Sequence, residues 1–203
     1  MSRRKLGLRY EEEYLSDEEF MEEVIPLSVE SVAVDLIDNP RFFQVLRVIY
    51  EHENTTIAKI CKILGFSESS VNRYVRNAIA HKLVKVTRGL HGKRRHFELT
   101  SEGKRAVDKA LDLLKKALKS KARLYGEEYE RIADKLAKIL DLEADEEVEH
   151  IFDLERAREI LRPYGLENEA KQLIVEIMPT YGRRIITEGK YLIFIKKRRV
   201  EEY

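Results

Sequence analysis

Between residues 28 and 82, apolar side chains recur three and four positions apart, which is the spacing of one buried face on an α-helix. The pattern restarts after residues that cap or begin helices: Ser28, Pro40, Thr55 or Thr56, and Ser67. Gly65-Phe66 predicts a tight turn before the last restart, because glycine can adopt the left-handed conformation. The expected buried faces are Val29, Val32, Ala33, Leu36 and Ile37; Phe42, Phe43, Leu46, Ile49 and Tyr50; Ile57, Ile60, Cys61 and Leu64; and Val71, Val75, Ala78 and Ile79.

After Leu83 the period changes from that of a helix to that of a strand. Val84 and Val86 precede a basic loop over residues 88–95, and Phe97 and Leu99 follow it, so this segment predicts a β-hairpin. Thr100 or Ser101 then caps a long helix that we expect to run from Glu102 to about Tyr125 and to end at Gly126.

Two segments, Thr56–Arg76 and Gly92–Gly103, resemble the winged helix-turn-helix domains of bacterial and archaeal repressors, most of all the MarR and ArsR type. The second contains Leu99-Thr100 followed by Gly103 and a long helix, which is how the hairpin, or wing, commonly ends in those domains. The resemblance covers about residues 40–125. It implies a DNA-binding transcription regulator whose fourth helix, residues 67–82, enters the major groove.

We therefore expect a mainly α fold with small β-hairpins, of the α+β class: a winged helix-turn-helix, a long helix and a C-terminal α+β domain. The expected divisions are an acidic N-terminal arm (1–27), the winged helix-turn-helix (28–100), a linker or dimerisation helix (101–126) and a C-terminal domain (127–203). In the C-terminal domain we expect helices over 127–141, 153–162 and 166–178 and a hairpin over 183–197 turning at Glu188-Gly189. This order fits a second winged helix, in which the helix equivalent to the reading helix would be acidic. The alternative is an effector or dimerisation domain of mixed α+β type.

The net charge of the 203-residue chain, +1, conceals a strongly basic middle. Residues 41–125 contain 20 basic and 7 acidic side chains, a net charge of +13. Residues 1–40 contain 4 and 11, a net charge of −7, and residues 126–203 contain 14 and 19, a net charge of −5. The asymmetry predicts a polyanionic partner for the middle of the chain, most simply double-stranded DNA.

The predicted DNA contacts fall into three groups. The outward face of the fourth helix has Arg, Asn and Ser, the residue types that pair with base edges in the major groove. The wing loop is basic and suits the minor groove or the backbone, and the start of the third helix suits phosphates. The candidate residues are Ser69, Ser70, Asn72, Arg73, Arg76 and Asn77; Arg88, His91, Lys93, Arg94 and Arg95; and Thr55, Thr56 and Lys59.

The long helix has apolar residues near heptad spacing, and the resemblance implies a homodimer formed through it. A dimer places two reading helices about one DNA turn apart, on a pseudo-palindromic site. The alternative is that the same residues pack against 28–37 and 127–140 of their own chain. The residues predicted to dimerise are Val107, Leu111, Leu114, Leu118 and Tyr125.

Enzymatic and metal-dependent functions lack sequence support. We find no Walker A loop, no dinucleotide-binding glycine motif, no HExxH and no nucleophile elbow. Cys61 is the single cysteine, and the histidines lack ligand spacing, so we expect no metal, no cofactor and no enzyme. A charged content of 37%, against roughly 25% in ordinary domains, indicates a thermophile, which we take to be archaeal. With no apolar signal region and no membrane-spanning run, we expect a cytoplasmic protein.

The sequence is compatible with two functions. The first is a dimeric, sequence-specific transcription regulator. The second is a tandem winged-helix scaffold, such as a replication initiator, a chromosome-organisation protein or a component of the transcription machinery, with a protein partner bound through 127–203. The regulator predicts a short palindromic site, and the scaffold predicts weak or non-specific DNA binding.

Overall fold

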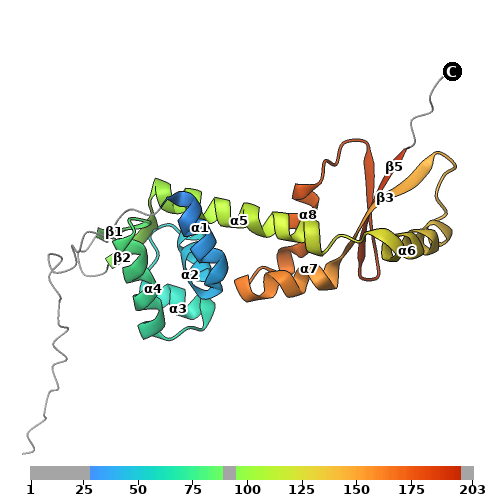
Figure 1. The fold of residues 1–203 in the computed structure, drawn as a ribbon. Helices are drawn as coiled ribbons and strands as arrows, with labels where there is room; N and C mark the ends of the chain where they lie inside the picture. The colour runs from blue at the N-terminus through green and yellow to red at the C-terminus, as the bar shows by residue number, and fades with distance from the viewer. Residues whose placement is uncertain (1–27, 89–94, 198–203) are drawn as a thin grey trace, which may run out of the picture.

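The computed structural model describes residues 28–88 and 95–197 as an elongated molecule with a long helix, α5 (Ser101–Lys121), along its middle (Figure 1). The acidic segment 1–27 lies outside the described residues. The α+β class and the winged helix are confirmed. The N-terminal elements are α1 (Val29–Asp38), α2 (Pro40–Glu51), α3 (Ile57–Leu64), α4 (Glu68–Ala80), β1 (Val84–Arg88) and β2 (Arg95–Leu99). After α5 come α6 (Gly126–Ile139), β3 (Glu146–Asp153), α7 (Leu154–Leu161), the 3-10 turns η1 (Arg162–Tyr164) and η2 (Glu167–Glu169), α8 (Ala170–Ile177), β4 (Arg183–Glu188) and β5 (Tyr191–Lys197).

The predicted caps form in the N-terminal helices. The side chains of Ser28, Thr56 and Ser67 each accept a hydrogen bond from the backbone N–H three residues later. These bonds satisfy donors that have no partner within the helix. Gly65 has φ +68°, in the left-handed region, and ends α3 as expected.

Two residues expected in the core lie at its rim. Tyr50 is 40% exposed and Ile79 is 37% exposed. Tyr50 lies beside Asp108 of α5, whose negative charge raises the pKa of the Tyr50 hydroxyl. In α4 the buried face contains Tyr74 in place of Ile79, and the Tyr74 ring stacks on Phe42 with ring centroids 5.8 Å apart. Burying this aromatic pair turns Ile79 outward.

The junction between the wing and α5 explains the Leu-Thr-x-x-Gly pattern physically. The Thr100 hydroxyl donates to the Lys82 carbonyl at 2.7 Å and accepts from the Gly103 N–H at 3.1 Å. A Cβ on Gly103 would lie 2.1 Å from the carbonyl oxygen of Leu83. Only glycine lets α5 approach the end of α4 this closely.

The long helix ends earlier than predicted. α5 stops at Lys121 with Ala122 as its C-cap, and Arg123 then forms an antiparallel bridge to Phe152 of β3. The Leu124 N–H donates to the Ile151 carbonyl and the Asp153 N–H to the Ala122 carbonyl, both at 2.8 Å. Gly126 therefore begins α6 instead of breaking α5, because the edge of β3 supplies hydrogen bonds that a longer helix would forgo.

The C-terminal half is a three-stranded antiparallel sheet, in the order β3-β5-β4, between two layers of helix. Phe152, Leu192 and Phe194 on one face join the main core, to which α5, α7 and α8 contribute. Ile151, Ile193 and Ile195 on the other face pack against α6 in a second, smaller core. The main core runs without a break from α1 to β5, so α5 belongs to both halves of the molecule.

Strand β3 was not predicted, and the final hairpin turns one residue later than predicted. Glu188 pairs with Tyr191, so the turn is Gly189-Lys190. β3 contains an irregularity between Val148 and His150, which interrupts the alternation a strand normally shows. Its carboxylates lie opposite cations of β4 and β5, including Arg183 against Glu149.

Candidate nucleic-acid interface

Helix α4 is held rigidly against the rest of the N-terminal half. Ser67 caps it, and the buried side chains on its inner face are Val71, Tyr74, Val75 and Ala78. Because successive residues are about 100° apart around a helix, the side chains most directly opposite this face are Ser69, Arg73 and Arg76. All three are exposed.

The two asparagines predicted to read bases lie on opposite flanks of that outward face. Asn72 is half-buried on one flank. Asn77, on the other, lines a surface hollow together with Asp35 and Asp38 of α1. The negative charge of these carboxylates makes the surroundings of Asn77 unfavourable for a DNA backbone.

Arg73 is oriented before any ligand binds. Its guanidinium carbon lies 5.1 Å from the centroid of the Tyr74 ring, and Nη2 donates to the Tyr74 hydroxyl at 3.4 Å. Tyr74 is itself stacked on Phe42 in α2. A stacked guanidinium loses less conformational entropy when it binds, and Arg73 makes no ion pair within residues 28–88 and 95–197 that would have to break first.

The first turn of α4 presents three hydroxyl groups. The Ser67 oxygen lies 3.2 Å from that of Ser69 and donates to that of Ser70 at 2.9 Å. These hydroxyls bond to one another at the surface, and hydroxyl groups can turn to a phosphate or a base with little rearrangement.

One of the residues predicted to contact phosphates cannot do so. The Thr55 side chain is fully buried, and its backbone carbonyl accepts from the Phe97 N–H at 2.8 Å. Thr55 thus begins the small sheet of the wing instead of facing solvent. Thr56 and Lys59, at the start of α3, are half-buried and exposed respectively.

The wing is anchored to the loop before α3. β1 pairs antiparallel with β2, from Val84 opposite Leu99 to Arg88 opposite Arg95. The His96 ring nitrogen Nδ1 lies 2.7 Å from the carbonyl oxygen of Asn54, which positions the base of the hairpin. Arg95 is exposed. The candidates His91, Lys93 and Arg94 lie outside the described residues, as does the side chain of Arg88.

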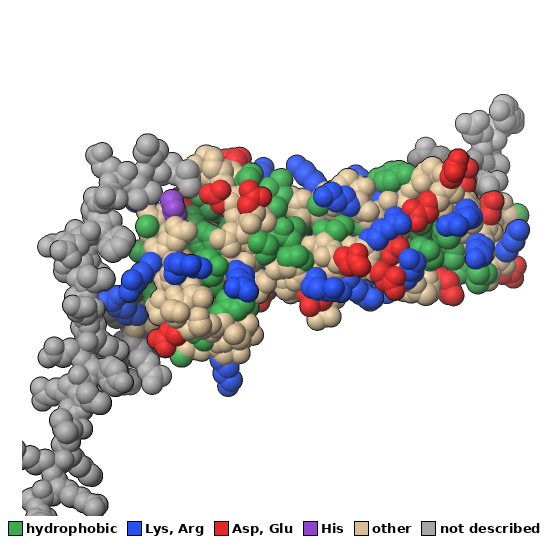
Figure 2. All heavy atoms as spheres, turned by 60° about the horizontal axis from the view of Figure 1, so that its bottom comes forward, with side chains coloured by type: hydrophobic (Ala, Val, Ile, Leu, Met, Phe, Trp, Pro, Cys, Tyr) green, Lys and Arg blue, Asp and Glu red, His purple; other side chains and the backbone are tan. Residues whose placement is uncertain are grey.

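Positive charge is concentrated at this end of the molecule. In Figure 2, Lys and Arg side chains gather over the end formed by α3, α4 and the hairpin, whereas positive and negative side chains are interspersed over the C-terminal half. The C-terminal pattern reflects ion pairs such as Arg184–Glu146 and Lys196–Glu147.

The stripe predicted to dimerise packs inside its own chain. Val107, Leu114 and Leu118 are at most 3% exposed, and Leu111 packs against the same core. The main partners of α5 are α1, α2, α7 and α8, so the packing against residues 28–37 named in the alternative is present, and α6 is not among the main partners. Tyr125 lies beyond the end of α5 and is 53% exposed, with Arg123 over its ring.

The described residues do not include a group of three or more His, Cys, Asp or Glu side chains that could bind a metal ion. Cys61 is half-buried on α3, where burial raises the pKa of its thiol. Among the described helices, none is long and apolar enough to cross a membrane.

Comparison with known proteins agrees with this geometry. Residues 39–95 match the sequence model of the MarR family. Over this segment the chain is therefore similar to the MarR family. The segment contains α2, α3, α4 and β1, and thus the whole surface of α4 described above.

Solved structures show a weaker likeness over about half of this chain. A MepR mutant of S. aureus bound to an oligodeoxyribonucleotide is 24% identical over 56% of this chain and 85% of that chain, with a TM-score of 0.40. The MarR protein of Listeria monocytogenes is 18% identical over 56% of this chain and 82% of that chain, with a TM-score of 0.34. No curated protein matches the chain significantly.

Proposed function

We propose that this protein is a transcription regulator that binds double-stranded DNA in a sequence-specific manner through its MarR-type segment. The observation that carries the proposal is the exposed face of α4, where Ser69, Arg73 and Arg76 project from a helix whose opposite face is buried. Arg pairs with guanine in the major groove, and Ser accepts either base type. The net charge of +13 over residues 41–125 supplies the attraction to phosphates.

In this proposal α4 lies in the major groove and the wing lies on the adjacent minor groove or backbone. Thr56 and Lys59 contact phosphates at the start of α3, and Arg95 does so from the base of the wing. Asn72 reaches a base from the flank of α4. The protein acts without a cofactor and catalyses no reaction.

Selection of random duplex DNA by the purified full chain, at about 150 mM salt, tests the function. A recovered sequence motif supports the regulator. A palindrome with half-sites about ten base pairs apart would further indicate a dimer on DNA. Recovery of no motif would contradict sequence-specific regulation and favour the scaffold, whose protein partners would then be sought.

The wing gives a separate prediction. Removing Lys93 and Arg94 together, each replaced by alanine, should weaken binding to every DNA sequence similarly. The slope of log K against log salt should become shallower by up to about 1.8, because roughly 0.9 counterions are released per phosphate contact. Titrations at several salt concentrations measure it.

A double variant of Lys135→Ala and Lys138→Ala on α6 removes the same charge from exposed positions in the C-terminal half and should leave the slope unchanged. Equal slopes for the wing variant and the wild-type protein would remove the wing from the DNA contacts.

A further inference from the structure

The small sheets in the two halves of the molecule have the same topology. In the first half, Thr55 bridges to Phe97 on β2, and β2 pairs with β1, so the order is first strand, last strand, middle strand. In the second half, β3 pairs with β5 and β5 with β4, which is the same order. Every pairing in both sheets is antiparallel.

The helices follow the same plan. α3, a turn and α4 lie between the first and middle strands of the first half, and α7, a turn and α8 do so in the second. Each turn contains a left-handed glycine followed by an apolar residue that packs in the core: Gly65 (φ +68°) and Phe66, and Gly165 (φ +69°) and Leu166. The last part of α5 takes the place that α2 has in the first half, and α6 is an addition on the far face of the sheet.

From this correspondence we propose that the C-terminal half is a second winged helix that shares α5 with the first, and that its helix-turn-helix binds the α1–α2 corner of the same chain instead of nucleic acid. The contact, which we call the clamp, couples DNA binding at α4 to the position of the C-terminal half. The clamp stands on the fold alone, whereas the coupling rests on the proposed function.

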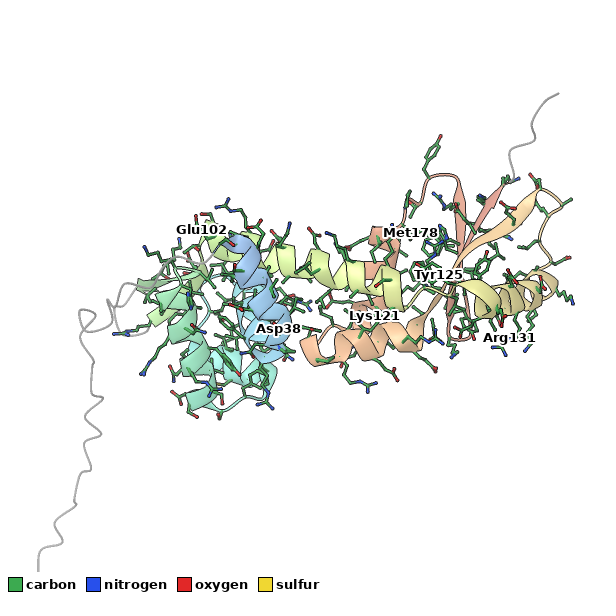
Figure 3. The ribbon with its side chains drawn as sticks, in the orientation of Figure 1. Asp38, Glu102, Lys121, Tyr125, Arg131 and Met178 are labelled. Carbon is green, nitrogen blue, oxygen red and sulfur yellow. The ribbon has the colours of Figure 1, made fainter. Side chains whose placement is uncertain are left out.

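The clamp is made by the turn between α7 and α8. The Gln44 amide donates to the Pro163 carbonyl at 2.7 Å, and the Tyr164 hydroxyl donates to the Ile37 carbonyl at 2.9 Å. The Tyr164 ring meets Phe43 edge to face, with centroids 5.7 Å apart. In Figure 3, Asp38 marks the end of α1, which lies beside the end of α7.

An ion pair closes the clamp. The Arg47 side chain is 18% exposed, and its guanidinium binds the Glu169 carboxylate and also pairs with Glu51 one turn along α2. Only the arginine of this network is largely covered, since the side chains of Glu169 and Glu51 are 37% and 45% exposed. Glu169 is one of the carboxylates that make the second helix-turn-helix acidic. Its negative charge is paired with Arg47 of the same chain.

In the second winged helix, charged side chains of α8 and of the hairpin tip, the positions that correspond to the DNA-contacting ones of the first, form ion pairs within the chain. The exposed side chains of α8 are Lys171, Gln172 and Glu176, and both Gln172 and Lys115 of α5 bind Glu176. At the tip of the second hairpin, Lys190 pairs with the buried Asp153. The Lys190 carbonyl also accepts from the Leu154 N–H at 2.8 Å. Among the described residues of α8, no arginine faces outward as Arg73 does on α4.

Helix α2 connects the clamp to the DNA-reading face. Phe43 contacts Tyr164 of the clamp, and the neighbouring Phe42 stacks on Tyr74, which carries Arg73. A shift of α2 would therefore move both aromatic contacts. Because binding free energies are reciprocal, loosening the clamp should weaken DNA binding, and DNA should protect the clamp.

A charge-swap cycle on the full chain tests the proposal: Arg47→Glu, Glu169→Arg and the double variant. Each single variant should increase amide hydrogen exchange over residues 162–169 about fivefold or more, and the double variant should restore it. Each single variant should also weaken DNA binding about fivefold or more.

Glu169→Arg separates coupling from bulk electrostatics, because it adds positive charge and would otherwise strengthen DNA binding. Stronger binding by this variant, or an unchanged affinity of both single variants, would overturn the coupling. Unchanged exchange over 162–169 in both would overturn the clamp, and this readout remains valid even if the protein does not bind DNA.

Two control variants complete the design. Glu102→Arg reverses a charge of the exposed Glu102–Arg105 pair at the other end of α5 and should leave exchange over 162–169 unchanged. Lys171→Ala removes an exposed cation of α8 and should leave the salt slope of DNA binding unchanged. A shallower slope would show that the second winged helix touches DNA and would overturn its assignment as a clamp.

Discussion

Gly103→Ala should lower the free energy of unfolding by about 2–3 kcal/mol, a value typical of overpacking a tight contact. The added Cβ would lie 2.1 Å from the Leu83 carbonyl oxygen, which already accepts a hydrogen bond from the Thr100 N–H. Alanine would otherwise favour the helix by up to about 1 kcal/mol, so the clash has to exceed this gain. Thermal and urea unfolding of the full chain measure the difference.

Lys104→Ala, in the same turn of α5 but exposed, is the matched control and should change stability by less than about 0.5 kcal/mol. A Gly103→Ala protein as stable as the wild type would show that α5 can move away from the end of α4. The wing and α5 would then be less tightly joined than the Thr100 hydrogen bonds indicate.

Arg73→Ala and Arg76→Ala should each weaken binding to the selected DNA site by about 1–3 kcal/mol, or roughly 5- to 150-fold, with a much smaller loss on random DNA. Both guanidinium groups project from the middle of the exposed face of α4, and each can bind one guanine with two hydrogen bonds. Asn72→Ala should follow the same pattern if the half-buried amide reaches a base. Competition binding against random duplex DNA measures the two losses separately.

Asn77→Ala is the matched control on the same helix, because Asn77 lines a hollow with Asp35 and Asp38. This variant should change neither the affinity for the selected site nor the affinity for random DNA. Arg73→Lys provides a second control: the charge stays, but the planar group stacked on Tyr74 is lost. We expect it to lose specificity and to keep the salt slope. Equal losses by Arg73→Ala and Arg76→Ala on both kinds of DNA would reduce these residues to phosphate contacts.

The helices of the N-terminal half were predictable because their signals are local. A capping serine or threonine, a proline in the first turn or a left-handed glycine acts within a few residues of itself, and the apolar period shows which face turns inward. Positions at the edge of that face were not predictable, and Tyr50 and Ile79 are examples. Their burial depends on how neighbouring helices pack, as the stacking of Tyr74 on Phe42 shows.

The residues of the candidate site also divide into those that local sequence predicts and those that tertiary contacts decide. The exposed arginines of α4 follow from the helical period and the residue type. The sequence alone does not show that Thr55 is buried by a bridge to Phe97, or that Asn77 faces the acidic end of α1, because both contacts join segments far apart in the chain. The long-helix stripe illustrates the same limit, since an apolar face does not specify whether its partner is a second copy or the same chain.

Taken by itself, the sequence determined the succession of the helices and the two hairpins, the caps that begin the N-terminal helices, the exposed arginines of α4 and the basic charge around them. These properties depend on neighbouring residues and on charge sums. Only the tertiary structure decided that β3 completes a second sheet, that α5 ends at Lys121 and that the turn at Gly165 contacts α1 and α2. The physical reason is that each depends on partners distant in sequence. Cations of β4 and β5 pair with the carboxylates of β3, the edge of β3 supplies hydrogen bonds in place of a further helical turn, and the α1–α2 corner packs against Tyr164.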